Sequence, residues 1–311
     1  MAGCHCPPPF FIMTSRFADF LKSPGTIGYI VRGDQNSYNF RCDDLFEIGS
    51  LTKLLTADMV SNELYMQTIS LNNTVGDFFP VPKNKEYPTI VELLTHSSGY
   101  QKDYFEWRSV FHYYLGIDNS ITYPKKVMIS RLRKTIPDET DKHYRYSNFG
   151  YAVLGMILEK IQKRPYHLIL KDYLCKLGMN NTGVNMVESE DYWTWDLNDT
   201  FIASGGVTSN IGDMLHFLDY LLCKKTEYTP IKILRYFDTE DDVEEDDIGI
   251  GMSWKIRQDF TFYHTGCTEN FNSYISVNKE KRRGVVVLLK ESGNNLNAAK
   301  TIGYEIERFL G

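Results

Sequence analysis

The sequence predicts an α+β fold, with one antiparallel sheet flanked by N- and C-terminal helices and an all-helical subdomain inserted into it. Strand-like runs gather near both ends of the chain, and the long middle has mainly helical patterning. The chain has 311 residues, of which 42% are hydrophobic and 24% charged, enough to bury a sizeable core. We therefore expect a flexible N-terminus over residues 1–13, an α/β subdomain from residues 14–49 and 248–311, and a helical subdomain over residues 50–247.

The expected strands rest on apolar runs that are bounded by turn residues. Near the N-terminus, two such runs flank Arg32-Gly33-Asp34-Gln35-Asn36, which indicates a hairpin. The dense acidic run at residues 238–247 is expected to form a solvated loop, because its like charges repel one another. Four more strand-like runs follow it. The expected strands are residues 26–31, 37–42, 248–257, 260–265, 271–277 and 284–290.

The expected helices rest on apolar residues spaced three or four positions apart. A short helix over residues 17–22 ends at Ser23-Pro24-Gly25, and a longer amphipathic one runs from Ser50 to Gln67. Further helices are expected at residues 89–95, 123–134, 148–162, 166–176, 211–223 and 297–310. A cleft between the sheet and the helical subdomain is the natural place for a pocket.

Charge and cysteine usage exclude several classes of function. The net charge is −6 and no stripe of Lys and Arg is present, so we expect no nucleic-acid partner. No apolar run is long enough for a membrane span or a signal-peptide core, which favours a cytoplasmic location. The six cysteines lack C-x-x-C spacing and are interpreted as free thiols, so we expect neither a metal nor another cofactor.

Ser50 and Lys53 form the motif with the clearest chemistry. A serine that opens a helix shares one helical face with a lysine three residues later, close enough to exchange a proton. A lysine in a desolvated, positively charged site can accept the serine proton, and the helix N-terminus supplies N–H groups for an oxyanion. A second match, Ser276-Val277-Asn278-Lys279, is interpreted as a hairpin turn. The motif alone therefore does not separate a nucleophile from coincidence.

Two further motifs would complete a site around Ser50. Tyr146-Ser147-Asn148 precedes an expected helix, and a tyrosine near cations can shuttle a proton while an asparagine binds an amide or the lysine. His264-Thr265-Gly266 lies on an expected strand whose edge can align an extended acyl substrate. The N–H of Cys267 would complete an oxyanion hole with that of Ser50. Each motif alone is also typical of an ordinary helix entry or strand, and only their conjunction favours a site.

The chain resembles the serine β-lactamase and penicillin-binding-protein superfamily. It is most similar to the class C-like branch, which contains β-lactamase-related serine hydrolases, esterases, D-aminopeptidases and DD-carboxypeptidases. The resemblance spans nearly the whole chain and implies a β-lactamase/transpeptidase-like fold. Besides the three motifs, it rests on Pro24-Gly25-Thr26, Leu93-Leu94-Thr95-His96-Ser97-Ser98-Gly99, Leu177-Gly178-Met179-Asn180-Asn181-Thr182, Ala203-Ser204-Gly205-Gly206-Val207, Ile248-Gly249-Ile250-Gly251 and Phe271-Asn272-Ser273.

The resemblance assigns catalytic roles to three residues in the helical subdomain and a substrate-binding role to a fourth. It implies that Ser50 is the acylated nucleophile and that Lys53 is its general-base partner. Tyr146 would carry the proton during acylation and deacylation, and Asn148 would contact a substrate amide.

The resemblance also assigns roles to the strand that carries His264. This histidine stands where many relatives have a lysine, and it would support Tyr146 or a substrate carboxylate. Thr265, Gly266 and Cys267 would bind the acyl substrate. A histidine is mostly neutral near pH 7, which weakens the case for a dedicated β-lactamase. Cys267 stands where small residues are usual, and His96 is expected to be structural.

The leading hypothesis is a serine hydrolase that forms a Ser50 acyl-enzyme with an ester, amide or D-amino-acid peptide. One alternative is a β-lactamase or penicillin-binding DD-peptidase, and another is a catalytically weak relative that serves as a binding or scaffold protein. The expected partner is a small-molecule or short-peptide acyl substrate. The sequence leaves the oligomeric state open.

Overall fold

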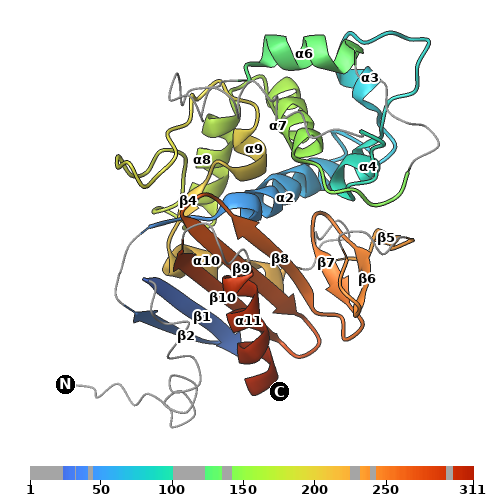
Figure 1. Ribbon diagram of the computed structural model, residues 1–311. Helices are drawn as coiled ribbons and strands as arrows, with labels where there is room; N and C mark the ends of the chain where they lie inside the picture. Colours follow the sequence, from blue (N-terminus) through green and yellow to red (C-terminus); the bar gives the residue numbers. More distant parts are fainter. Residues whose placement is uncertain are drawn as a thin grey trace.

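The computed structural model of the protein describes residues 24–31, 33–40, 45–100, 123–134, 142–224, 232–238, 243–291 and 297–311. The expected flexible segment 1–13 and the expected helix 17–22 lie outside these residues, as do Cys4, Cys6 and Cys42. Figure 1 shows a sheet with helices against its faces and a larger group of helices beyond one end of its central strands.

Within the described residues, eight strands form one antiparallel sheet in the order β2-β1-β10-β9-β8-β7-β6-β5. Strand β1 pairs with β10 from Gly25 opposite Leu289 to Val31 opposite Arg283. The predicted union of N-terminal and C-terminal strands in one sheet is therefore confirmed. The strands are β1 (Gly25–Val31), β2 (Asp34–Phe40), β5 (Arg235–Tyr236), β6 (Asp247–Ile250), β7 (Lys255–Arg257), β8 (Phe262–Cys267), β9 (Phe271–Asn278) and β10 (Arg283–Lys290).

The two faces of the sheet are covered by different helices, because side chains alternate along each strand. On β10, Val285 and Val287 pack with α11 (Ala298–Phe309), while Val286 belongs to the larger core on the opposite face. Helix α10 (Ile211–Cys223) lies on that opposite face against β1 and β10. It approaches so closely that a Cβ at Gly28 would lie 2.8 Å from the side chain of Ile211.

Helix α2 (Thr52–Tyr65) is the central helix of the helical part, and the expectation that it is amphipathic is wrong. Polar as well as apolar residues of this helix are buried, because other helices pack around it. Thr56 Oγ1 lies 2.6 Å from the Tyr166 hydroxyl and donates to the Ala203 carbonyl at 2.7 Å. The surrounding helices are α3 (Val75–Phe78), α4 (Ile90–Leu94), α6 (Lys125–Lys134), α7 (Asn148–Gln162), α8 (Tyr166–Lys176) and α9 (Ile202–Gly205).

The expected single strand over residues 248–257 is wrong, because this segment folds into the two strands β6 and β7. Gly251 N–H donates to the Trp254 carbonyl at 2.8 Å and closes the turn between them. The buried Trp254 explains why the apolar run continues through the turn. At the other side of the turn, Ser253 has a φ of +69°.

Two other expectations are corrected in the sheet. Ser276 does not lie in a turn but inside β9, where it pairs with Val285 and Tyr263. Asp247 belongs to β6 rather than to a solvated loop, and the Tyr263 hydroxyl donates to its carboxylate at 2.9 Å. Residues 239–242 of the acidic run lie outside the described residues.

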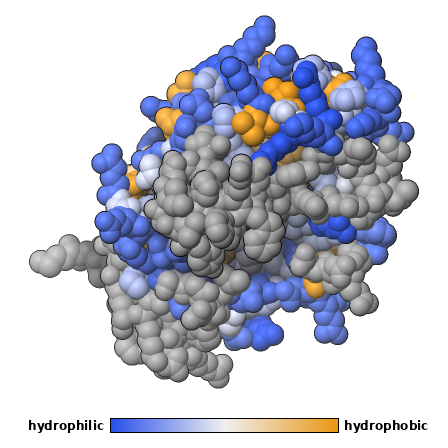
Figure 2. Space-filling view, turned by 45° about the horizontal axis from the view of Figure 1, so that its top comes forward, coloured by the Kyte–Doolittle hydropathy of each residue, from blue (hydrophilic) through white to orange (hydrophobic). Residues whose placement is uncertain are grey.

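A second, two-stranded sheet joins β3 (Phe46–Glu47) to β4 (Thr208–Ser209) beside the start of α2. Among the described residues, no helix has both the length and the apolar character needed to cross a bilayer. In Figure 2, the coloured residues on the face shown are mostly hydrophilic, with small groups of hydrophobic residues among them.

Candidate active site

Ser50 lies in a single 3-10 turn, Gly49–Leu51, that runs directly into α2. The turn is held from one side by Ile48 N–H, which donates to the Val207 carbonyl at 2.9 Å. On the other side, Gly49 has a φ of +49°, and a Cβ there would lie 2.9 Å from the backbone N of Cys267. Glycine is needed at this position because both the conformation and the space exclude a side chain.

The Lys53 ammonium nitrogen joins three groups of the site. Its Nζ lies 3.0 Å from Ser50 Oγ, 2.7 Å from Asn148 Oδ1 and 2.7 Å from the Ser204 carbonyl. The side chain is fully buried, and Nζ lies 4.8 Å from the centre of the Tyr146 ring. The ammonium group can donate to all three oxygens; once it has lost a proton, the two carbonyl oxygens can still accept its N–H bonds, and its lone pair can face Ser50 Oγ. The structure thus brings together Ser50, Lys53, Tyr146 and Asn148.

His96 holds the segment that carries Tyr146. The two rings stack with centroids 4.6 Å apart, and Ser147 N–H donates to His96 Nδ1 at 3.1 Å. Because Nδ1 accepts, the proton of the neutral ring lies on Nε2, which is buried and has no partner among the described residues. Burial, and next the charge of Lys53, lower the pKa of His96 well below its usual value, so the ring is neutral.

Strand β8 presents its open edge to Ser50. Thr268 N–H donates to the Phe271 carbonyl at 2.9 Å, and Gly266 lies opposite Ser273. The alternation of an antiparallel ladder therefore turns the backbone groups of Thr265 and Cys267 away from β9. Strand β7 pairs with β8 only as far as Tyr263, so it does not cover this part of the edge.

Gly266 brings the strand and the Ser50 turn into backbone contact. A Cβ at Gly266 would lie 2.2 Å from the Ile48 carbonyl oxygen and 3.1 Å from Ser50 N. The N–H groups of Ser50 and Cys267 thus belong to two segments that touch without a side chain between them. This is the arrangement that an oxyanion hole made of two backbone donors requires.

His264 lies beside Tyr146, with ring centroids 6.2 Å apart. Its Nδ1 lies 2.6 Å from the Thr265 carbonyl, which can only accept, so Nδ1 carries the proton. Burial, and next the charge of Lys53, lower the pKa of His264 to about 3. The ring is therefore neutral at pH 7, and its Nε2 is a hydrogen-bond acceptor rather than a cation.

The thiol of Cys267 is exposed and donates to the Thr268 carbonyl at 3.2 Å. Its partly desolvated surroundings raise the pKa of the Cys267 thiol, so little thiolate is present at neutral pH. The contribution of this residue to the site is its backbone.

One contributor to the site was missed by reasoning from the sequence, and the ring contact of a second residue was not predicted. The Ser204 carbonyl accepts a hydrogen bond from Lys53, but a backbone acceptor leaves no mark on residue type. His96 was expected to be structural, and its stacking on Tyr146 depends on a loop contact between residues far apart in the chain. The motif Leu94-Thr95-His96-Ser97-Ser98 was the only signal that could have pointed to it.

The sequence of this chain matches a family model and several known proteins. The sequence model of the family named Beta-lactamase matches residues 15–307. The probable fimbrial assembly protein FimD, serogroup H1, of Dichelobacter nodosus is 26% identical over 217 residues, which are 63% of this chain and 52% of that protein. The chain spans about half the length of such curated relatives.

Two solved structures show the same fold. A beta-lactamase/D-alanine carboxypeptidase from Yersinia pestis, complexed with citrate, matches with a TM-score of 0.75 and 18% identity over 96% of this chain and 98% of that chain. A class C beta-lactamase matches with a TM-score of 0.77 and 18% identity over 99% of each chain.

Proposed function

The chain belongs to the Beta-lactamase family, and from this premise we propose that it is a serine hydrolase acting through a Ser50 acyl-enzyme. Its substrate is an ester, an amide or a D-amino-acid peptide. The observation that carries the proposal is the environment of Lys53 Nζ, 3.0 Å from Ser50 Oγ and 2.7 Å from each of two carbonyl oxygens. Those two acceptors occupy the N–H bonds of a neutral amine and direct its lone pair to the serine proton.

In the proposed mechanism, Lys53 takes the Ser50 proton as Oγ attacks the substrate carbonyl carbon. The N–H groups of Ser50 and Cys267 stabilise the oxyanion of the tetrahedral intermediate. Tyr146, next to the Lys53 nitrogen, passes the proton to the leaving group, which departs and leaves the acyl-enzyme. Water then attacks the ester carbonyl, and the same groups return the proton to Ser50 Oγ. Asn148 holds Lys53 in place.

The neutral state of His264 favours substrates without a carboxylate next to the scissile bond. A lysine ammonium would offer a positive charge to such a carboxylate, whereas this ring offers a lone pair. Esters and neutral amides therefore suit the site better than β-lactams or peptides with a free C-terminus. The second candidate, a β-lactamase or DD-peptidase, is favoured by the fold, which the Yersinia pestis beta-lactamase/D-alanine carboxypeptidase shares.

The test is intact-protein mass spectrometry with a fluorophosphonate probe, combined with turnover of p-nitrophenyl acetate. We expect one adduct, on Ser50, and a loss of turnover of at least about 10³-fold in Ser50→Ala. Ser276→Ala is the matched control, since this serine belongs to the second Ser-x-x-Lys match but lies inside β9. An adduct on another residue, or full turnover in Ser50→Ala, would refute the proposal. Turnover of nitrocefin and release of D-alanine from D-alanyl-D-alanine peptides distinguish the second candidate.

A further inference from the structure

A cavity of about 1150 Å³ lies directly beside the candidate active site. Its walls are the loop at residues 188–195, the segment at residues 205–208, the turn at residues 268–270, and Glu47. Gly205 follows the serine whose carbonyl binds Lys53, and Thr268 follows Cys267. The cavity therefore begins at the two backbone segments that flank Ser50. We call it the acidic pocket.

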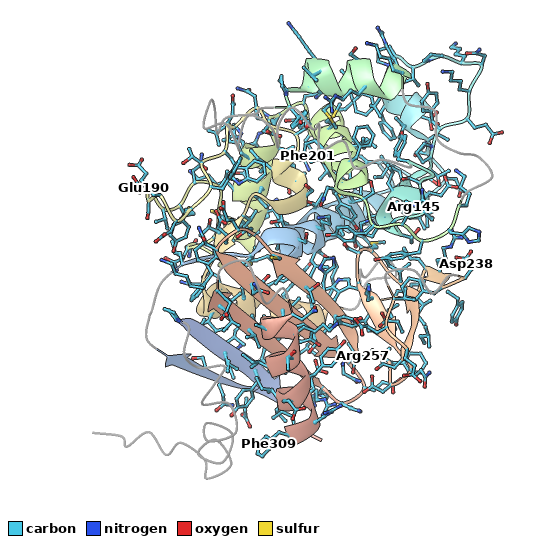
Figure 3. The ribbon with its side chains drawn as sticks, in the orientation of Figure 1. Arg145, Glu190, Phe201, Asp238, Arg257 and Phe309 are labelled. Atoms are coloured by element: carbon cyan, nitrogen blue, oxygen red, sulfur yellow. The ribbon has the colours of Figure 1, made fainter. Side chains whose placement is uncertain are left out.

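All the charged residues among those that line the acidic pocket are acidic, and none of them is Lys, Arg or His. They are Glu47, Glu188, Glu190, Asp191 and Glu269. Lys290, from outside the lining, pairs with Asp191 at 2.7 Å. Figure 3 shows Glu190 on the loop at the outer edge of the molecule.

Glu47 is the buried member of this set, with 8% of its surface exposed. One of its oxygens accepts a hydrogen bond from Trp193 N–H at 2.5 Å. Among the described residues, no Lys, Arg or His lies within ion-pair distance of its carboxylate. A buried carboxylate without a counter-charge has lost hydration and gained no cation in return, so a positively charged ligand in the pocket would be stabilised there.

Aromatic side chains form the remaining wall of the same loop. Trp193 and Trp195 have ring centroids 6.1 Å apart, and Trp193 is 41% exposed although it is large and apolar. Tyr192 is anchored on Phe271 with ring centroids 4.8 Å apart. Indole faces next to carboxylates are the surroundings in which ammonium and guanidinium groups bind best.

We propose that the acidic pocket receives the acyl side chain of the substrate and selects acyl groups that carry an ammonium or guanidinium group. This rests on the proposed function, since it names the substrate class of the Ser50 acyl-enzyme. The acyl carbonyl lies at the Ser50 and Cys267 N–H groups, and the side chain passes Gly205 into the pocket. A Cβ at Gly205 would meet no atom within 4 Å, so the entrance is open at this point.

The test compares p-nitrophenyl esters that differ only in charge. One pair is the ester of γ-trimethylammoniobutyrate and its isostere in which carbon replaces nitrogen, and a second pair uses the longer ε-trimethylammoniohexanoate. Each kcat/KM is divided by the rate constant for hydrolysis of the same ester by hydroxide, which removes differences in intrinsic reactivity. We expect a preference for the cationic ester of at least about tenfold in one of the two pairs. The preference should fall as sodium chloride is raised.

Four variants, one of them a control, test whether the acidic pocket causes the preference. We expect Glu47→Gln, and separately the double variant Glu188→Gln with Glu190→Gln, to reduce the ratio of cationic to neutral ester toward one. The control is Glu280→Gln with Glu305→Gln, which removes the same charge from the turn after β9 and from α11 and should keep the ratio of the wild type. Gly205→Phe should slow hydrolysis of the cationic and neutral esters of both pairs relative to p-nitrophenyl acetate, because the phenyl ring fills the entrance to the acidic pocket.

Equal normalised rates for the cationic and neutral esters of both pairs in the wild type would overturn the pocket proposal. So would a preference that survives unchanged in both sets of pocket variants. Turnover of p-nitrophenyl acetate and labelling of Ser50 are measured on the same samples. If these persist while the charge preference is absent, only the pocket proposal fails. If Ser50 is not acylated, the proposed function fails.

Discussion

At the scale of single residues, the chemistry of Lys53 depends on its surroundings. Its side chain is completely buried, and its nitrogen lies close to three oxygen atoms. Two of the three oxygens are carbonyl acceptors, whereas the Ser50 hydroxyl can also donate its proton to the lysine nitrogen. The sequence predicted that Ser50 and Lys53 share a helical face. It contained no information on the Ser204 carbonyl, which belongs to the backbone of a short helix 151 residues further on.

His264 supplies a prediction about pH at the same scale. Its pKa is about 3 in the folded protein and near 6.5 when unfolded, so between these values the unfolded chain binds one more proton. The contribution of His264 to the free energy of unfolding is therefore fully present above pH 6.5, and it is lost as the pH falls from 6.5 toward 3. This group alone should lower the free energy of unfolding by about 2 kcal/mol between pH 7 and pH 5.

We expect His264→Gln to lack this contribution, so its free energy of unfolding should fall by about 2 kcal/mol less than that of the wild type over the same range. Urea unfolding at the two pH values measures the difference. An equal fall in both proteins would show that His264 is protonated when folded, which contradicts the neutral ring deduced from its hydrogen bond to Thr265.

At the scale of elements, α2 is held near its middle by a buried charge. Lys224 Nζ, just after α10, lies 2.6 Å from Asp58 Oδ1, and both side chains are almost fully buried. The hydroxyls of Tyr173 and Tyr220 donate to the other oxygen at 2.8 and 2.9 Å. Burial, and next the Asp58 carboxylate, raise the pKa of Tyr220, so this phenol stays a donor. Helices α2, α8 and α10 therefore meet at one carboxylate.

We expect Lys224→Met to lower the free energy of unfolding by about 3–5 kcal/mol, because it leaves the Asp58 charge buried without a cation. The double variant Asp58→Asn with Lys224→Met should recover most of this loss, since no charge remains. Urea unfolding of both variants at pH 7 measures the difference. A double variant no more stable than Lys224→Met would mean that packing of the lysine stem, rather than charge, holds the helices together.

The sequence predicted the helices and strands that have strong hydrophobic periodicity. It did not predict features that depend on contacts between segments far apart in the chain. Helices α7, α8 and α10 have the predicted bounds, because their apolar stripes face one core. Helix α2 was expected to be amphipathic, but its polar residues Asp58 and Glu63 are buried and bind side chains from other helices. The two-residue strands β3 and β4 are too short to leave a periodic pattern.

For the candidate site, residue types and motif order were enough to name the side chains that the fold brings together. Ser50, Lys53, Tyr146 and Asn148 meet around one nitrogen, and their catalytic roles stay predictions. The acidic pocket could not be predicted, because its walls come from four separate segments of the chain. The tautomer of His264 could not be predicted either, because it depends on the contact of Nδ1 with the Thr265 carbonyl.

At the scale of the whole molecule, the sheet and the helical part meet at the nucleophile. Gly49 on one side and Gly266 on the other lie in backbone contact, and Ser273 Oγ donates to the Ile48 carbonyl at 2.8 Å across the same boundary. The two N–H groups of the proposed oxyanion hole come from opposite sides of this boundary. Its width therefore controls both the packing of the two parts and the geometry of the site.

We expect Gly266→Ala to separate the two parts, because its Cβ would lie 2.2 Å from the Ile48 carbonyl oxygen and 2.3 Å from Ser273 Oγ. Overpacking of this kind costs about 1–3 kcal/mol of stability. A shift of the oxyanion donors by about 1 Å should lower kcat for p-nitrophenyl acetate by roughly 10²-fold. Gly212→Ala in the first turn of α10 is the control, since its Cβ would be 3.6 Å from the nearest atom and alanine favours a helix.

Unfolding in urea and steady-state kinetics are measured on both variants. If Gly266→Ala lost stability but kept its full kcat, the site would tolerate a wider boundary, and the Cys267 N–H could not be one of the two oxyanion donors.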